Sequence, residues 1–247
     1  MKKLYVNKYN PSSKLSHIID IYWILENPTQ EIVNIPIVPD GNMDIVYNNN
    51  VLLLVGSLDE GVIMPIEPNT KVFGIRFKPS ILSQLLTIKA SDFVNKIVPL
   101  EDVSKELFIL LSFDENSEKN KVKNLNIILE LFCKNVILNQ VILKIIDEIM
   151  TKKGDVSIKD ISQANNINPR QLERLFNNLV GFSPKRFTNI IKFFYAFKSL
   201  LKSDFNELSL KALDFGYYDQ AHFNRDFKKF SNLTPTDKIM SVLYNTK

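Results

Sequence analysis

The sequence contains little cysteine, histidine or glycine, and each shortage excludes a class of protein. Its 247 residues include one cysteine, two histidines and seven glycines. Cys133 alone cannot form an internal disulfide, and His17 and His222 are too few and too far apart for structural zinc. So few glycines also argue against a nucleotide fold with several glycine-rich loops. We therefore expect no metal and no other cofactor.

Long apolar runs are also missing. The longest clean run, residues 51–55, has the length of a strand, whereas a membrane-spanning helix needs about 20 apolar residues. The chain starts with lysines but meets polar residues before an apolar stretch develops, which argues against a secretory signal. With 45% hydrophobic and 23% charged residues, the composition is that of a globular protein. We expect a cytoplasmic protein that does not bind a membrane.

Positive charge is concentrated towards the C-terminus. From Val141 onward there are 17 Lys and Arg against 11 Asp and Glu, whereas residues 1–140 carry 14 against 16. A basic domain beside a mildly acidic one suggests that the basic part meets a polyanion. The excess is small enough for an ordinary solvated surface, so charge alone does not decide the function.

The first third of the chain has the pattern of a β domain. Turn-forming residues separate short apolar runs at residues 17–25, 31–38, 43–47, 51–56, 62–66 and 72–77. This spacing predicts a small sandwich or barrel. After Pro79 the apolar residues recur at helical intervals. We therefore expect a β-rich sensory or regulatory domain with trailing helices over residues 1–113. A helical linker over residues 114–140 would pack on its own domain or pair with a second copy.

The remaining residues, 141–247, contain an internal repeat. Four positions recur 51 residues later: Leu172, Arg174, Phe176 and Pro184 correspond to Phe223, Arg225, Phe227 and Pro235. Ahead of the expected turn the offset is 50 residues, so that Ser162 matches Ala212 and Asn166 matches Gly216. The chain thus carries two copies of one short unit.

Each copy predicts a helix, a turn and a second helix. In the first copy, Ser157 is expected to cap a helix that runs to Ala164, and Asn166 tolerates the left-handed turn. Asn168-Pro169 then supplies a cap and a first-position proline. The second copy places its first helix at Leu208, Ala212 and Leu213, its turn at Gly216 and its cap at Asp219.

The second helix of each copy has an apolar and a polar face. The apolar positions are Leu172, Leu175, Phe176 and Leu179 in one copy and Phe223, Phe227 and Phe230 in the other. Arginine reads guanine, asparagine and glutamine read adenine, and small apolar groups contact the thymine methyl. Either helix alone fits a solvated surface helix, but the duplication favours DNA reading. The polar positions are Arg170, Glu173, Arg174 and Asn177, then Gln220, Ala221, Asn224, Arg225 and Lys228.

A single helix over residues 184–203 would join the two units. Its 20 residues span about 30 Å, and successive major grooves lie about 34 Å apart. Such a connector would place both readers on one side of a duplex. The groups suited to phosphate contacts near it and near the second reader are Ser183, Lys185, Arg186, Lys228 and Thr234.

Residues 216–230, followed by Leu233-Thr234-Pro235, form a long specific motif, and residues 168–176 and 181–184 agree with it. Through these motifs, residues 143–242 resemble the AraC/XylS family of bacterial transcriptional regulators. The resemblance implies an α+β protein whose all-α C-terminal domain has two helix-turn-helix units joined by a long helix, without enzymatic activity. It implies base contacts from Arg170, Glu173, Arg174, Gln220, Ala221, His222, Asn224 and Arg225.

Three positions depart from the family pattern. Ser162 stands where alanine is usual, Lys211 where an apolar residue is expected, and Asn232 where a glycine is usual. None of these changes removes a DNA contact. They bear instead on how the helices of each unit pack and end.

Residues 39–46 and 74–79 are similar to the N-terminal domain of a subset of these regulators. This second resemblance covers residues 5–100 and implies a cupin-like domain that binds an effector or forms a dimer. A metal-dependent cupin enzyme needs clustered histidine and carboxylate ligands, which His17 alone cannot supply.

The sequence suggests an effector site but leaves alternatives open. Arg76 lies mid-strand in an apolar run and suits an anionic effector, yet an ion pair with Asp44 or Glu67 explains it as well. Tyr22, Trp23, Tyr47 and Phe73 suit a pocket wall, yet strand aromatics more often form the core.

We therefore expect a sequence-specific transcriptional regulator whose partner is double-stranded promoter DNA. RNA polymerase, a second copy in a homodimer and a small-molecule effector are further candidate partners. One alternative is a constitutive DNA-binding regulator whose front half only dimerises. Another is a DNA-modifying enzyme, but Cys133 lies in an apolar helical pattern that indicates packing, and no carboxylate cluster suggests a metal.

Overall fold

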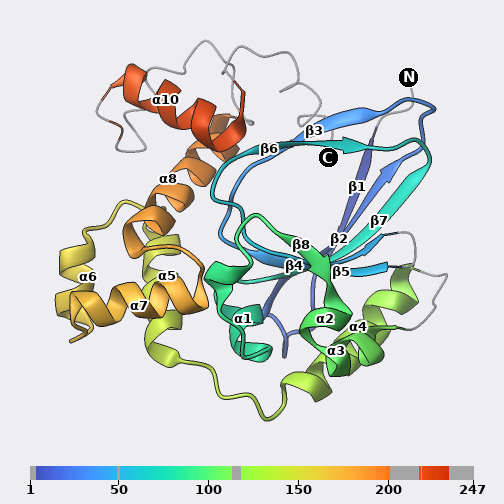
Figure 1. The fold of residues 1–247 in the computed structure, drawn as a ribbon, viewed down its shortest axis with the longest axis horizontal. Coiled ribbons are helices and arrows are strands. Elements are labelled where there is room, and N and C mark those ends of the chain that lie inside the picture. Colours follow the sequence, from blue (N-terminus) through green and yellow to red (C-terminus); the bar gives the residue numbers. More distant parts are fainter. Residues whose placement is uncertain (1–3, 49–50, 113–117, 201–216, 218, 234–247) are drawn as a thin grey trace.

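The computed structural model describes residues 4–48, 51–112, 118–200, 217 and 219–233 (Figure 1). The strands are β1 (Tyr5–Tyr9), β2 (Ile19–Asn27), β3 (Val33–Ile37), β4 (Met43–Asn48), β5 (Val51–Val55), β6 (Val62–Ile66), β7 (Thr70–Phe77) and β8 (Ile97–Pro99). The helices are α1 (Ile81–Leu85), η1 (Ala90–Asp92, a 3-10 helix), α2 (Leu100–Val103), α3 (Lys105–Leu111), α4 (Glu118–Cys133), α5 (Gln140–Thr151), α6 (Ile158–Ala164), α7 (Pro169–Leu179), α8 (Pro184–Leu200) and α10 (Gln220–Ser231). We refer to β1 to α4 as the N-terminal region and to α5 to α10 as the C-terminal region.

The strands of the N-terminal region form two sheets. An antiparallel sheet has the order β1-β2-β7-β4-β5-β8 in the described residues, and β3 and β6 pair separately. Alternation along the strands separates the side chains into two layers. Val46 and Val72 pack with β3 and β6, whereas Ile45 and Phe73 pack with the helices. The predicted sandwich is therefore present, and β1 and β8 extend it beyond the expected runs.

Helix α4 packs on this sandwich. Its Leu125 and Leu129 are fully buried in the cluster formed by the helical face of the large sheet. Ile127 and Leu131 lie on the other side of the helix and are more than half exposed. Of the two arrangements left open by the sequence, α4 thus shows packing on its own region.

The C-terminal region is all helical and has its own core. Ile145, Phe176, Phe187, Phe193 and Phe227, from four different helices, are completely buried in one cluster. The rings of Phe193 and Phe227 meet edge to face with centroids 5.7 Å apart, a favoured aromatic geometry. Because α8 contributes residues along its length to this cluster, it holds the helices on either side of it in place.

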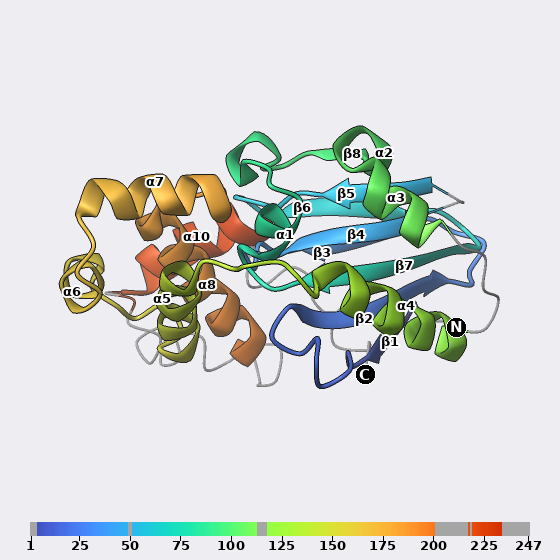
Figure 2. The same cartoon turned by 90° about the horizontal axis from the view of Figure 1, so that it is seen from below.

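The two regions lie side by side and touch (Figure 2). Val38, Ile63 and Val94 of the N-terminal region pack against the C-terminal core. The Ser83 hydroxyl donates a hydrogen bond of 2.6 Å to the carbonyl of Leu179 at the end of α7. Within the described residues, no helix is both long and apolar enough to cross a membrane.

Candidate DNA interface

The first helix-turn-helix unit is formed by α6 and α7 and has the predicted local signals. The Ser157 hydroxyl accepts from the backbone N–H of Asp160 at 3.3 Å and so caps α6. Asn166 takes the left-handed turn with φ 48°. The Asn168 carboxamide oxygen accepts from the N–H of Arg170 at 2.9 Å, and Pro169 is the first residue of α7. The predicted start of α6, the turn and the start of α7 are therefore confirmed.

Ser162, one of the departures from the family pattern, is accommodated inside this unit. Its side chain is buried, and its hydroxyl donates to the backbone carbonyl of Ile167 on the far side of the turn. A buried hydroxyl is costly only when it lacks a partner. Here the hydroxyl links the two ends of the turn.

The described part of the second unit is α10. The Asp219 carboxylate accepts from the N–H of His222 at 2.6 Å and caps the helix, as predicted. Asn232 ends the helix in the left-handed conformation with φ 57°, which asparagine adopts more readily than most residues other than glycine. The expected first helix and turn lie outside the described residues: Leu208, Lys211, Ala212, Leu213 and Gly216.

Both second helices bury an apolar face and expose a polar one. Leu172 and Phe176 of α7 are fully buried, and Phe223 and Phe227 of α10 are at most 1% exposed. The exposed candidates for base reading are Arg170, Glu173, Arg174, Ala221, Asn224 and Arg225, while Asn177 and His222 are partly buried. Of Gln220 only the backbone, as the first residue of α10, belongs to the described part.

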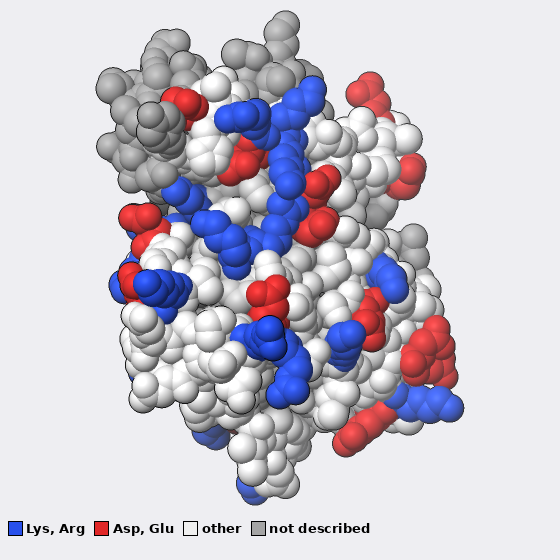
Figure 3. Space-filling view, turned by 60° about the vertical axis from the view of Figure 1, so that its left-hand side comes forward, with Lys and Arg blue, Asp and Glu red and all other residues white. Residues whose placement is uncertain are grey.

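The candidates for phosphate contact lie at the start of α8 and along α10. Ser183 precedes α8, and its hydroxyl accepts from the N–H of Arg186 at 3.2 Å. Lys185 and Lys228 are exposed. Thr234 lies outside the described residues. On this side of the molecule, Lys and Arg side chains form a band with acidic side chains next to it (Figure 3).

Arg186 differs from its neighbours because it is directed towards the N-terminal region. Its guanidinium donates to the backbone carbonyl of Asp59 and lies 3.9 Å from the carboxylate of that residue and 3.8 Å from that of Glu60. Lys229, at the end of α10, is 4.0 Å from the same Glu60 carboxylate. Lys229 was not among the residues expected at the interface, although it directly follows Lys228 in the motif.

The four aromatic residues considered for an effector site do not lie together on a cavity wall. Beneath α3 and α4, the Phe73 ring stacks on Tyr22 with centroids 6.3 Å apart and meets Tyr47 edge to face with centroids 5.7 Å apart. The Tyr22 hydroxyl bonds to Asn126 and the Tyr47 hydroxyl donates to the carbonyl of Leu111, each at 3.0 Å. Trp23 lies on the opposite face of the sheet among the residues that pack with β3 and β6.

Arg76 is held by two carboxylates. Its guanidinium binds Asp44 through two hydrogen bonds of 3.0 Å and lies 3.0 Å from Asp40. The predicted alternative of an ion pair with Asp44 is confirmed, and Asp40 takes the place considered for Glu67. Burial raises the pKa of Asp44 despite the opposing effect of Arg76. Burial also acts to lower the pKa of Arg76, but the two carboxylates outweigh it and raise that pKa.

A cavity of about 1240 Å³ lies between the two regions. Arg76 is at its edge, and α5 and α8 form much of its wall. Sequence reasoning missed this cavity because its lining comes from segments far apart in the chain. The residues that line it include Lys78, Leu143, Met150, Phe194 and Phe197.

Comparisons with known proteins agree with the helical geometry. A family profile described as a helix-turn-helix domain matches residues 137–238, and one described as a domain of unknown function (DUF6597) matches residues 7–99. No curated protein matches the sequence.

Crystal structures of ToxT from Vibrio cholerae resemble the whole chain. ToxT of strain O395 is 13% identical with a TM-score of 0.45, and the similarity covers 99% of this chain and 98% of that one. ToxT of strain SCE256 bound to an unsaturated fatty acid is 13% identical with a TM-score of 0.44, covering 100% and 95%.

The helix-turn-helix profile covers α5 to α10, and it includes both capped reader helices. Residues 137–238 thus form a helix-turn-helix domain of this profile, and the protein is a DNA-binding transcriptional regulator of the AraC type.

Proposed function

We propose that α7 and α10 read base edges in two successive major grooves of one duplex. The observation that carries this proposal is that both helices expose a polar face while their apolar faces are buried in one core. The connecting helix α8 has 17 described residues, a length of about 25 Å. The 20-residue connector expected from the sequence would be about 30 Å long, close to the spacing of about 34 Å between successive grooves.

The proposed contacts divide into two kinds. Base edges would be read by Arg170, Glu173, Arg174 and Asn177 of α7 and by Gln220, Ala221, His222, Asn224 and Arg225 of α10. Phosphates would be bound by the cationic side chains and hydroxyl groups of Ser183, Lys185, Arg186, Lys228 and Thr234.

Replacing Arg174 or Arg225 with alanine tests the base contacts. Both side chains are exposed on the polar face of a reader helix. Each replacement is expected to cost about 1–3 kcal/mol at one position of the DNA site and to relax specificity there. Footprinting followed by affinity measurements on single-base variants of the site would show this.

Lys185→Ala is the matched control, since Lys185 is an exposed basic residue at the start of α8. We expect it to weaken binding to every sequence and to flatten the salt dependence by about one unit. If the arginine variants lose the same affinity on specific and random DNA, neither arginine reads bases.

We also propose that the N-terminal region passes an effector signal to the reader helices through the cavity between the regions. An occupant would contact α5 and α8 of the C-terminal region together with strands of the other. A coupling of about 1–3 kcal/mol is typical for such linked sites. The alternative is a constitutive regulator, and contacts with RNA polymerase or with a second copy stay predictions.

A further inference from the structure

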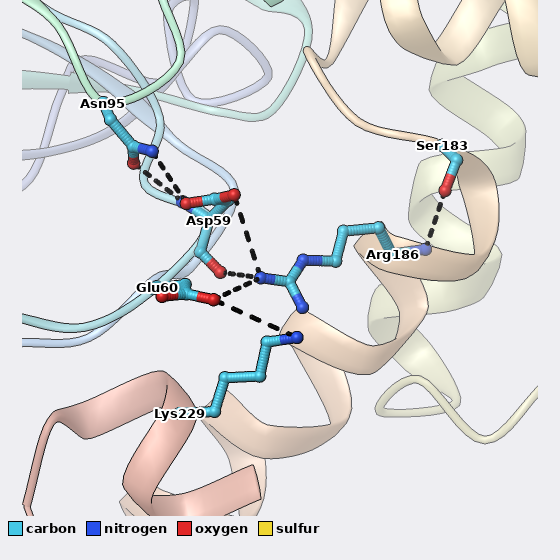
Figure 4. A network of polar contacts seen from close by, with 6 residues as sticks. All are labelled: Asp59, Glu60, Asn95, Ser183, Arg186 and Lys229. Atoms are coloured by element: carbon cyan, nitrogen blue, oxygen red, sulfur yellow. Dashed lines mark hydrogen bonds and ion pairs between the residues drawn. The ribbon is translucent and has the colours of Figure 1, made fainter.

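The loop between β5 and β6 brings acidic side chains to the reader helices. Asp59 and Glu60 lie against the start of α8 and the end of α10, where they contact Arg186 and Lys229 (Figure 4). The Arg186 guanidinium also covers the ring of Phe230, 4.8 Å from its centroid. Two cations that belong to the DNA-binding region are thus turned towards carboxylates of the other region.

The backbone of this loop lies directly on α10. The N–H of Gly61 donates to the carbonyl of Lys229 at 3.3 Å. A Cβ atom at Gly61 would lie 2.5 Å from the carbonyl oxygen of Phe230 and 2.6 Å from the backbone of Ser231. Only glycine therefore permits this approach.

Asp59 is held in position by a residue of its own region. Asn95 donates to the Asp59 carboxylate at 2.7 Å and accepts from the Asp59 N–H at 3.1 Å (Figure 4). The loop consequently presents its carboxylate and its carbonyl oxygens in a fixed arrangement before any cation meets them.

We propose that the loop Asp59-Glu60-Gly61 is an internal substitute for DNA phosphate, which occupies Arg186 and Lys229 in the DNA-free protein and must leave before they reach DNA. This inference rests on the proposed function of α8 and α10. Carboxylate and phosphate offer arginine the same kind of anionic oxygen acceptors, so the two compete for one guanidinium. The loop also covers the C-terminal turn of the second reader.

The contact is suited to release. The ion-pair distances of 3.8 to 4.0 Å are long, and the Glu60 side chain is 57% exposed. Long pairs with such an exposed carboxylate are individually weak, and the hydrogen bond from Arg186 to the Asp59 carbonyl supplies the rest of the contact. DNA phosphates can therefore displace the loop, while the contact still lowers the affinity of the closed form.

The charge test uses the full-length double variant Asp59→Asn with Glu60→Gln. The control is Glu101→Gln with Asp102→Asn, which removes the same two charges from exposed positions on α2. We expect the loop variant to bind specific and random DNA about fivefold more tightly than the control, at the lower end of typical coupling. The slope of log affinity against log salt concentration should be steeper by up to about two units, because two further cations are free to exchange counterions for phosphate.

The steric test is Gly61→Ala, which leaves every charge in place. The added methyl group cannot fit against Phe230 and Ser231, so we expect the loop to lift and DNA affinity to rise as in the charge variant. Two results would overturn the proposal. One is a charge variant that binds DNA no more tightly than the α2 control, and the other is a Gly61→Ala variant whose DNA affinity is unchanged. If Arg174→Ala and Arg225→Ala still lose specificity in that case, the proposed base reading by α7 and α10 holds, and only the proposed role of the loop is wrong.

Discussion

Arg76 illustrates how one residue ties two strands and a turn together. Strands β4 and β7 are neighbours, with Asp44 directly opposite Arg76. Opposite charges in such cross-strand pairs stabilise a sheet. Asp40, in the turn before β4, adds a second carboxylate 3.0 Å from the guanidinium. The charge of Arg76 is thereby compensated on two sides at the edge of the cavity.

Replacing Arg76 with methionine should destabilise the protein strongly. The Asp44 side chain is only 12% exposed, and removing one partner of a buried pair costs about 3 kcal/mol or more. In the variant, Arg76 no longer opposes the burial that raises the pKa of Asp44, so the loss should shrink as the pH falls from 8 to 5 and the stranded carboxylate takes up a proton. Urea unfolding at both pH values measures this.

The double variant Arg76→Met with Asp44→Asn is the control for that experiment. It removes the stranded charge and should recover part of the lost stability. A single variant as stable as the unaltered protein at pH 8 would contradict the structural role assigned to the pair.

At the scale of elements, the reader helices depend on their caps. Asp219 supplies a side-chain acceptor to the first turn of α10, and its negative charge also suits the positive end of the helix dipole. The rest of α10 is held by Phe223, Phe227 and Phe230, which are buried. The first turn, which carries several proposed base contacts, has less to hold it.

Asp219→Ala should therefore loosen the start of α10 and weaken specific DNA binding. Loss of such a cap costs about 1 kcal/mol, and amide hydrogen exchange in residues 221–223 should speed up accordingly. Asp219→Asn retains a capping oxygen and is expected to behave almost as the unaltered protein. Unchanged exchange in the alanine variant would mean that the cap is not what holds this turn.

The first helix-turn-helix unit could be predicted in detail because its signals are local. The caps at Ser157 and Asn168 and the turn at Asn166 each involve partners within a few residues. The connector was predicted to residue 203, and α8 is described as far as Leu200, with residues 201–203 outside the described part.

The contacts between distant segments could not be predicted in the same way. Arg186 was selected for phosphate, but its partner Asp59 lies 127 residues earlier in the chain. Strand alternation places Phe73 and Trp23 on opposite faces, yet only the packed structure shows that the Phe73 face is covered by α3 and α4. Local patterns reveal which residues share a face and leave open what covers it.

At the scale of the whole molecule, the cavity between the regions is the proposed site for an effector. Its wall combines apolar side chains such as Phe194 and Phe197 with basic ones such as Lys78. A mainly apolar pocket with a few polar groups is the usual form of a small-molecule site. The constitutive alternative would make no use of it.

A thermal-shift screen on the full chain distinguishes a regulator that binds an effector from a constitutive one. A small molecule at 100 times its dissociation constant stabilises the fold by about 2.7 kcal/mol. The variant Met150→Trp, which fills part of the cavity, should abolish the shift. A compound that still stabilises this variant binds elsewhere, and a library that yields no stabilising compound favours the constitutive regulator.

Helix α8 carries Arg186 near its beginning, and Phe194 and Phe197 border the cavity two to three turns further on. A continuous helix of this length moves as a nearly rigid rod, because its backbone hydrogen bonds resist compression. An effector in the cavity and an anion bound to Arg186 would therefore act on opposite ends of the same helix. A small tilt of α8 displaces both of its ends together. An effector in the cavity would therefore change the position of Arg186 relative to DNA without a separate hinge.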